Sequence, residues 1–282
     1  MRIALAQINL HIGDFKNNIA RIISFIDKAK LMKADVVIFP EMAVCGYPPR
    51  DFLEFRDFIL ESQNAVDAIA KVCHGIAAVV GAPTINPAEK GKPLYNSACF
   101  LSEGKIQTIT HKTLLPNYDV FDEYRYFEPN RLPYQVAEYK NYRFALTICE
   151  DLWNISDDPL YIRNPMDELM QLKPDVIINI AASPFNYNQD KIRKEVLSRN
   201  ATQYNLPVFY VNHVGGQTEL LFDGGSMVMA PDGSLFDEFK FFEEDLRVYN
   251  LNDFLYRRSL LATRDSVDDS SDIEITTNQK QQ

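Results

Sequence analysis

Three side chains with complementary chemistry each stand at the end of an apolar stretch. Glu41 follows ADVVIFP, Lys112 follows SACFLSEGKIQTITH, and Cys149 ends YRFALTIC. Ligand sites in α/β proteins gather at the carboxyl ends of strands, so we expect these three side chains to meet. A thiol, a carboxylate that can act as its base and an ammonium that can stabilise an oxyanion together make a site for acyl transfer through a thioester.

Taken singly, each of these residues also has a purely structural interpretation. A lone cysteine after an apolar strand is usually buried and inert. Alone, Glu41 would more often cap a helix or lie on the surface, and Lys112 would more often be a solvated hairpin lysine. The catalytic interpretation therefore depends on the three occurring together. We interpret the other three cysteines as packing residues and His213 as a structural histidine, because the thioester chemistry does not require them.

Alternating strands and helices must position these residues. Period-two and four-three hydrophobic patterns predict the following elements. The predicted strands are 2–9, 34–40, 75–83, 142–149, 174–182 and 207–214, and the predicted hairpins are 97–111 and 224–239, turning at Glu103-Gly104 and Asp232-Gly233. The predicted helices are 15–29, capped by Asp14, then 51–72, and then 190–204 with Ile192, Val196, Leu197, Ala201 and Tyr204 on one side.

Each half of the chain thus offers βαβ-like units and hairpins whose strands are apolar on both faces. Two sheets packed together and covered by helices would bury such strands. We therefore expect an α/β fold, and a four-layer αββα sandwich is one solution. A single doubly wound sheet is the alternative, and hydrophobic periodicity does not choose between them.

Composition and charge exclude several classes of protein. The formal net charge of the 282 residues is −10 and no basic cluster stands out, which argues against a nucleic-acid partner. No apolar run approaches the roughly 20 residues of a membrane helix. The four cysteines have neither zinc-ligand nor redox spacing, so we expect no metal and a reduced, cytoplasmic protein. We expect one domain over residues 1–260 and a polar, acidic, disordered linker or tail over 261–282.

Four longer strings carry a resemblance to a known family. They are EMAVCGYPPRDFL, KTLLPNYDVFDEYRYF, ICEDLW and GGQTELLFDGGS. With the Glu–Lys–Cys order they resemble the nitrilase, or carbon–nitrogen hydrolase, superfamily over roughly residues 1 to 260. Within it they are similar to the N-terminal glutaminase domain of glutamine-dependent NAD⁺ synthetases. The resemblance implies the four-layer αββα fold of that superfamily.

The resemblance also implies roles for individual residues. Glu41 would be the general base, Cys149 the nucleophile that attacks the carboxamide of L-glutamine, and Lys112 the group beside the oxyanion. Glu150 would support the oxyanion through its backbone N–H, and Glu123 would orient Lys112 and help to keep it charged. Asp151 and Trp153 are expected to shape the turn around the cysteine.

For substrate binding, the resemblance suggests Tyr118 and Ser183 at the α-amino and α-carboxylate ends of glutamine. Members of the family usually carry a basic residue about six positions after this serine. Position 189 is a glutamine here, and the nearest basic residue is Lys191, so this loop departs from the family pattern. Lys191 is therefore the candidate for the basic residue that binds the substrate.

A glutamine-dependent NAD⁺ synthetase also needs a domain that binds ATP and Mg²⁺, and its phosphate loop is absent from these residues. We therefore expect the chain to be the glutaminase half of a longer protein, with a synthetase domain in cis, a homo-oligomeric state and no cofactor of its own. Two alternatives remain open. One is a stand-alone carbon–nitrogen hydrolase of the ω-amidase or nitrilase type, and the other is a binding protein with this fold and an inactive site.

Overall fold

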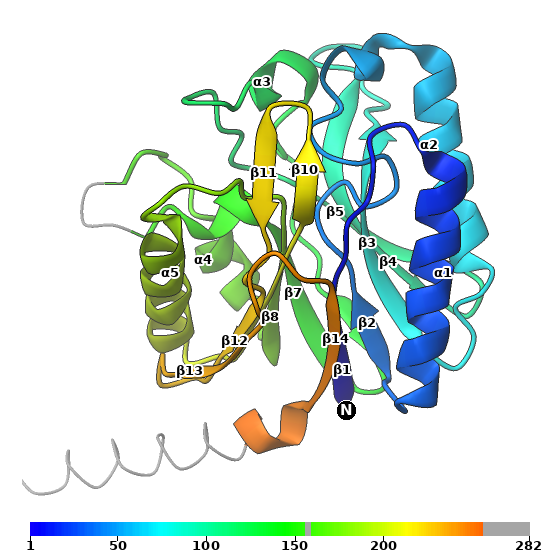
Figure 1. Cartoon of the computed structure of the whole chain (residues 1–282). Helices are drawn as coiled ribbons and strands as arrows, with labels where there is room; N and C mark the ends of the chain where they lie inside the picture. Colours follow the sequence, from blue (N-terminus) through cyan, green and yellow to red (C-terminus); the bar gives the residue numbers. More distant parts are fainter. Residues whose placement is uncertain (156–158, 256–282) are drawn as a thin grey trace, which may run out of the picture.

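Two six-stranded sheets pack face to face, and helices cover the outer face of each (Figure 1). The structure is a computed structural model, and it describes residues 1–155 and 159–255. The expected four-layer αββα sandwich is confirmed, and the single doubly wound sheet is wrong. The expected boundary at residue 260 and the tail beyond it lie outside the described residues.

The first sheet has the strand order β14-β1-β2-β3-β4-β5. The central strands β1, β2 and β3 run parallel, whereas β14, β4 and β5 are antiparallel to their neighbours. The bounds are β1 Arg2–Gln7, β2 Val36–Ile38, β3 Ala77–Ile85, β4 Leu94–Ser102, β5 Lys105–His111 and β14 Asp245–Asn250. The β4-β5 hairpin turns at Glu103-Gly104, as the sequence predicted.

The second sheet has the order β13-β12-β9-β8-β7-β6, again with three parallel strands, β7, β8 and β9, at its centre. Its bounds are β6 Ala137–Tyr139, β7 Tyr142–Ile148, β8 Val176–Ala181, β9 Val208–Asn212, β12 Met227–Met229 and β13 Leu235–Glu238. A separate two-stranded ribbon, β10 Val214–Gln217 with β11 Leu220–Asp223, extends beyond this sheet. The two sheets therefore repeat one plan, with parallel strands in the middle and antiparallel strands at the edges.

Helices α1 (Phe15–Leu31) and α2 (Arg56–Ala70) cover the first sheet, and α4 (Pro165–Met170) and α5 (Gln189–Tyr204) cover the second (Figure 1). Three short elements, η1 (Arg50–Glu54), α3 (Glu123–Tyr126) and η2 (Cys149–Leu152), lie in the connections near the site. The predicted helix 51–72 is divided at Phe55, whose extended backbone separates η1 from α2. Among the described residues, no helix is long and apolar enough to cross a membrane.

The alternation of side chains along β1 shows where the core lies. Ile3 and Leu5 pack into the interior between the two sheets, whereas Ala4 and Ala6 face the layer formed by α1 and α2. All four are fully buried. A strand that is covered on both faces has no polar side, which is why these strands appear in the sequence as continuous apolar runs.

The predicted start of α1 is confirmed, because the Asp14 carboxylate accepts a hydrogen bond from the backbone N–H of Asn17. The predicted buried face of α5 is partly wrong. Ile192 is exposed, whereas Arg193 and Asn200 are buried beside the expected Leu197. These two polar side chains are buried because each has internal hydrogen-bond partners, and hydrophobic periodicity does not detect such partners.

Candidate active site

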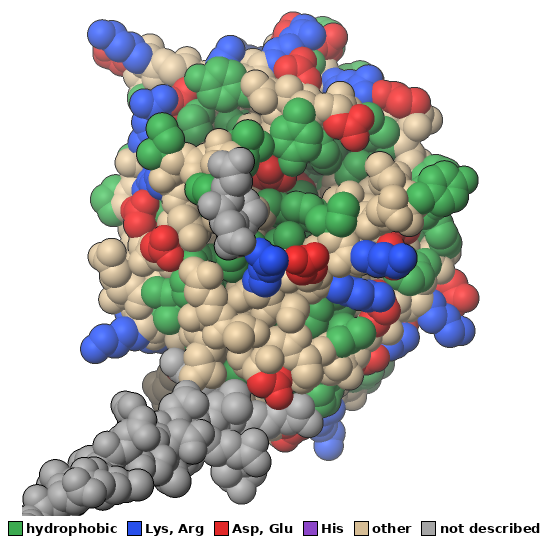
Figure 2. All heavy atoms as spheres, turned by 90° about the vertical axis from the view of Figure 1, so that its left-hand side faces the viewer, with side chains coloured by type: hydrophobic (Ala, Val, Ile, Leu, Met, Phe, Trp, Pro, Cys, Tyr) green, Lys and Arg blue, Asp and Glu red, His purple; other side chains and the backbone are tan. Residues whose placement is uncertain are grey.

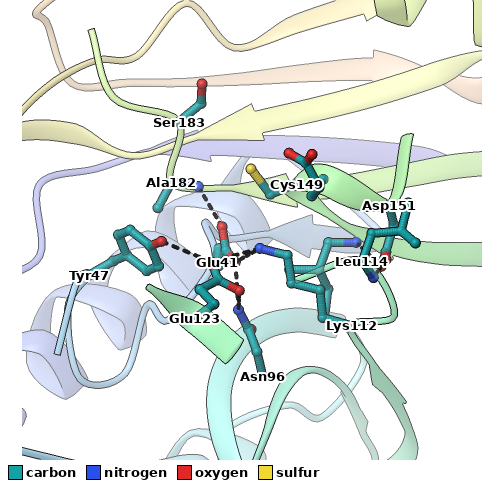
Figure 3. A network of polar contacts seen from close by, with 12 residues as sticks. Glu41, Tyr47, Asn96, Lys112, Leu114, Glu123, Cys149, Asp151, Ala182 and Ser183 are labelled. Atoms are coloured by element: carbon teal, nitrogen blue, oxygen red, sulfur yellow. Dashed lines mark hydrogen bonds and ion pairs between the residues drawn. The ribbon is translucent and has the colours of Figure 1, made fainter. Parts of the chain in front are cut away.

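Glu41, Lys112 and Cys149 come together at the carboxyl-terminal ends of strands from both sheets. Glu41 follows β2, Lys112 follows β5, and Cys149 follows β7. The side chains of all three point toward one space, with the sulfur of Cys149 on the same side as the carboxylate and the ammonium (Figure 3). The structure therefore brings together the three residues that the sequence analysis singled out.

The backbone at Glu41 is held against the neighbouring strand β3 at a position that only glycine can occupy. A Cβ atom on Gly81 would lie 2.3 Å from the backbone nitrogen of Met42 and 2.7 Å from the Cα atom of Glu41. The carbonyl oxygen of Gly81 accepts a hydrogen bond from the backbone N–H of Val44, at 3.2 Å. The missing side chain thus allows the turn that carries Glu41 to cross close over the sheet.

Three donors from different elements fix the Glu41 carboxylate. Lys112 Nζ and Asn96 Nδ2 donate to Oε1, at 2.9 and 2.6 Å, and the backbone N–H of Ala182, at the end of β8, donates to Oε2, at 2.9 Å (Figure 3). Oε1 therefore has two partners and Oε2 has one. Since a carboxylate oxygen can accept two hydrogen bonds, the free acceptor position of this network is on Oε2.

Lys112 lies between two buried carboxylates. Its Nζ donates to Glu41 Oε1 at 2.9 Å and to Glu123 Oε1 at 2.8 Å. Burial by itself lowers the pKa of Lys112, but the carboxylates of Glu123 and Glu41 outweigh it, so the pKa is raised well above its usual range. The side chain is therefore a fixed cation, as the oxyanion role requires.

Glu123 closes this network from the other side. Burial and the neighbouring Glu41 carboxylate together raise its pKa to about 7, against the opposing effect of Lys112. The hydroxyl of Tyr47 donates to Glu123 Oε1 at 2.8 Å, and Asn96 Nδ2 lies 3.4 Å from Oε2. Glu123 thus lies where the sequence analysis expected it, in direct contact with the ammonium of Lys112.

Cys149 stands on a strained turn directly after β7. Its φ of 43° lies in the left-handed region, where a residue with a Cβ atom is rare. The buried Asp151 carboxylate holds the turn, accepting from the backbone N–H of Ile148 at 3.1 Å and from those of Thr113 and Leu114 at 2.9 Å each. Asp151 therefore ties the cysteine turn to the segment that follows Lys112.

The thiol of Cys149 is protonated at rest. Burial raises its pKa well above the usual range, the negative charge of Glu41 adds to this effect, and the positive charge of Lys112 opposes it. A neutral thiol is a weak nucleophile, so the sulfur needs a base at the moment of attack. The Glu41 carboxylate beside it can fill that role.

A small cavity opens over the thiol. Its volume is about 190 Å³, and besides Cys149 its lining includes Tyr118, Glu150, Trp153 and Ser183. Figure 2 shows one face of the molecule, on which hydrophobic and acidic side chains gather around a hollow. A cavity of this size with a few polar groups suits one small molecule rather than a polymer.

The predicted binding residues fall into two groups. Tyr118 and Ser183 line the cavity, and the hydroxyl of Tyr118 donates to Glu150 Oε1 at 2.8 Å. Burial raises the pKa of Glu150, and the Tyr118 hydroxyl and the Lys112 charge oppose the shift. Lys191, by contrast, is exposed on α5 and is not part of the lining, so the structure does not bring it to the cavity.

The sequence analysis missed three residues that build the site. Asn96 bridges the two buried glutamates, Tyr47 donates to Glu123, and Arg193 lies behind Ser183, with its guanidinium 3.5 Å from Oγ. A signal for Asn96 was present. It shares a strand face with Ala98 and Phe100, which pack between the sheets, so it is a polar residue at an interior position.

The three other cysteines and His213 lie outside the lining of the cavity. Within residues 1–155 and 159–255, no group of three or more His, Cys, Asp or Glu side chains is placed to hold a metal ion. The cysteines at 45, 73 and 99 are buried and free, and burial raises the pKa of Cys73 and of Cys99 to about 12. His213 is buried against Phe222, with 4.9 Å between the ring centroids, and does not line the cavity.

Comparison with known proteins agrees with this geometry. The family model described as carbon-nitrogen hydrolase matches residues 2–255. A glutamine-dependent NAD(+) synthetase of Synechocystis sp. is 37% identical over 253 residues, which are 86% of this chain and 45% of that protein. The corresponding enzyme of Thermotoga maritima is 34% identical, over 89% of this chain and 42% of its own length. The chain thus spans about half the length of the curated relatives it matches.

Solved structures of related proteins also resemble this chain. Glutamine-dependent NAD⁺ synthetase from Acinetobacter baumannii superimposes with a TM-score of 0.79 at 34% identity, over 96% of this chain and 52% of that one. An amidase of the nitrilase superfamily from Nesterenkonia AN1 shares the fold, with a TM-score of 0.75 at 23% identity over 94% of this chain and 97% of its own. The family match, the relatives and the fold all agree, and the chain belongs to the carbon-nitrogen hydrolase family.

Proposed function

We propose that this chain is the glutaminase part of a glutamine-dependent NAD⁺ synthetase. It would hydrolyse L-glutamine through a thioester on Cys149 and supply ammonia for the amidation of nicotinic acid adenine dinucleotide. The observation that carries the proposal is the convergence of Cys149, Glu41 and Lys112 below a small cavity. The relatives named above, which are about twice as long, support the link to NAD⁺ synthesis.

Acylation begins with the neutral thiol. Glu41 takes the proton of Cys149 through the free acceptor position on Oε2 while the sulfur attacks the carboxamide carbon of glutamine. The oxyanion that forms is stabilised by the ammonium of Lys112 and by the backbone N–H of Glu150. Because Glu41 and Glu123 keep Lys112 charged, this stabilisation is in place before the substrate arrives.

The same carboxyl group then serves the three remaining proton transfers. Glu41 returns the proton to the amide nitrogen, the carbon–nitrogen bond breaks, and ammonia leaves the glutamyl thioester. A water molecule that loses a proton to Glu41 attacks the thioester carbon. Glutamate leaves, the sulfur takes the proton back, and the sum of the steps is glutamine plus water giving glutamate plus ammonia.

The proposal has consequences for partners and location. As proposed, the glutaminase reaction uses only groups of this chain and water, so this part needs no cofactor, whereas ATP and Mg²⁺ belong to the synthetase domain that would receive the ammonia. We propose that this domain is joined in cis and that the assembly is homo-oligomeric. Four free cysteines fit a reducing compartment, and we place the activity in the cytoplasm.

The test is a glutaminase assay on the purified 282-residue chain and on Cys149→Ala. We expect ammonia release from L-glutamine by the chain and none above background by the variant. 2-Oxoglutaramate and a small nitrile serve as competing substrates, because a stand-alone ω-amidase or nitrilase would prefer one of them. Preference for either over glutamine contradicts the proposal, and so does activity that survives in Cys149→Ala.

A further inference from the structure

The cavity over Cys149 carries charge of one sign only. Its lining includes two carboxylates, Asp119 and Glu150, and among the described residues that form it there is no lysine, arginine or histidine. Within the part of the chain that the structure describes, a ligand in this cavity therefore meets acids and neutral groups.

The cations nearest to the cavity are already paired or point elsewhere. The ammonium of Lys112 contacts Glu41 and Glu123. The buried guanidinium of Arg193 donates to Asp223 Oδ1 at 3.1 Å and to the carbonyl oxygen of Gly224 at 3.0 Å, so its charge is balanced behind the wall of the cavity.

Lys191 does not supply a cation to the cavity either. It follows the cavity residue Gln189 by two positions on helix α5 and is exposed, outside the lining. Residues two apart on a helix do not share a face, so the side chain of Lys191 leaves the helix in another direction from that of Gln189.

The two ends of glutamine would therefore be recognised unequally. The carboxylate of Glu150 can pair with an ammonium group, and it is fixed by hydroxyl groups of Tyr118 and Tyr161 that donate to Oε1, at 2.8 and 3.0 Å. The lining also includes Ser183, Asn186 and Gln189, which offer a hydroxyl and two amides to a carboxylate.

The start of α5 adds little to that second end. The first turn of a helix carries a partial positive charge, which favours an anion. Here Asp190 places a carboxylate in the same first turn and offsets that charge. A substrate carboxylate thus has neutral hydrogen-bond donors and no full opposite charge as partners.

We propose that this cavity selects ω-amides by a positively charged amino end and does not require the α-carboxylate. Its substrate class then includes 4-aminobutanamide, which is glutamine without its carboxylate. The inference rests on the proposed function, because it takes Cys149 as the nucleophile and this cavity as its substrate site. It goes further by naming which end of the substrate determines specificity.

The test compares ammonia release by the purified 282-residue chain from three amides. These are L-glutamine, 4-aminobutanamide, which lacks the carboxylate, and glutaramate, which lacks the amino group. Since neutral hydrogen bonds contribute modestly to binding, we expect kcat/KM for 4-aminobutanamide to be within about tenfold of that for glutamine. For glutaramate, which loses its charged partner at Glu150, we expect a fall of about a hundredfold or more.

Two variants sharpen the comparison. Gln189→Arg puts a guanidinium on the cavity wall and should raise the ratio of kcat/KM for glutamine over 4-aminobutanamide by about tenfold or more, since a charged partner is then present. Lys191→Ala should leave that ratio within about twofold, because an exposed lysine outside the cavity contributes little to binding.

The outcomes separate the two proposals. If glutamine is hydrolysed but 4-aminobutanamide is more than a hundredfold worse, the carboxylate is required and the inference is wrong while the glutaminase function stands. The inference is also overturned if, in Lys191→Ala, the ratio of kcat/KM for glutamine over 4-aminobutanamide falls more than tenfold, because Lys191 would then reach the carboxylate. If none of the three amides releases ammonia, the proposed function itself fails, and the inference with it.

Discussion

The Asp151 carboxylate accepts a hydrogen bond from the backbone N–H of Thr113 at 2.9 Å, and this contact links the turn that carries Cys149 to the segment that carries Lys112. Thr113 directly follows Lys112, and Asp151 lies two residues after Cys149. Burial raises the pKa of Asp151 to about 6, against three backbone N–H groups that lower it. The spacing between the ammonium and the thiol therefore depends on a buried side chain that touches neither.

Asp151→Asn should loosen this link. One carboxylate oxygen becomes an NH₂ group that faces a backbone N–H, so we expect a loss of about 2–3 kcal/mol in the free energy of unfolding. We also expect glutaminase activity per folded molecule to fall at least about tenfold, because small displacements of catalytic groups are expensive. Urea unfolding and initial rates measure the two effects.

Asp175→Asn is the matched control. Asp175 Oδ2 accepts from the backbone N–H of Arg143, at 2.8 Å, at the other end of strand β7. This variant should also be destabilised but keep its activity per folded molecule. An unchanged activity per folded molecule in Asp151→Asn would show that Asp151 acts through stability alone.

Lys112→Met should remove the cation that stabilises the oxyanion. It should also leave two buried carboxylates without a positively charged partner. We expect kcat to fall by about 10²–10³. We expect stability to fall by about 3–5 kcal/mol, because Glu41 and Glu123 then lack their cation. The double variant with Glu123→Gln, which removes one of the two carboxylates, should recover part of the stability and none of the activity. Recovery of activity would contradict a direct role of Lys112 in catalysis.

Glu41→Gln should separate the charge of Glu41 from its function as a base. The negative charge of Glu41 raises the pKa of Cys149, so the variant should have a lower thiol pKa. Alkylation by iodoacetamide, located on Cys149 by mass spectrometry, should then extend to lower pH than in the unaltered chain. Glutaminase activity should nevertheless fall by about 10³-fold, because proton transfer is lost. Unchanged activity would exclude Glu41 as the base.

His213 should make the fold sensitive to acid. Burial lowers its pKa to about 3, whereas the pKa of a histidine in an unfolded chain is about 6.5. Below pH 6.5 the unfolded chain binds a proton that the folded chain does not, so stability falls as the pH falls toward 3. We expect the contribution at pH 5 to be about 2 kcal/mol relative to pH 8.

Urea unfolding at pH 8 and pH 5 measures this effect. The difference in unfolding free energy between the two pH values should shrink by that amount in His213→Leu. It should not shrink in His74→Leu, because the side chain of His74 is 64% exposed. The comparison uses the pH difference and not the absolute stability, so the loss of packing in either variant does not obscure it.

Much of the fold could be predicted from the sequence because its strands are apolar and its turns are local. The hairpin at Glu103-Gly104, the cap at Asp14 and the strand ends that carry Glu41, Lys112 and Cys149 depend on neighbouring residues only. Hydrophobic periodicity did not decide between one sheet and two, because the answer depends on which strands pair across long distances in the chain, and only the family resemblance pointed to two.

The parts of the site that the sequence analysis missed are polar residues on buried faces. Arg193 breaks the apolar pattern of α5, and only the position of Asp223 on the distant strand β11 explains why it is buried. Asn96 likewise depends on Glu41 and Glu123, both far from it in the chain. Pairs of this kind become visible only when the partner is placed in space, which hydrophobic periodicity cannot do.

The thiol and its base are supplied by opposite sheets, and Glu41 is held in part by the backbone N–H of Ala182 at the end of β8. During synthesis on the ribosome, the amidase centre is therefore incomplete until residue 182 has emerged and the two halves have docked. A nascent chain in which only β1 to β5 have folded would release no ammonia. In a refolding experiment, recovery of catalysis would mark the docking of the two sheets rather than the formation of either one.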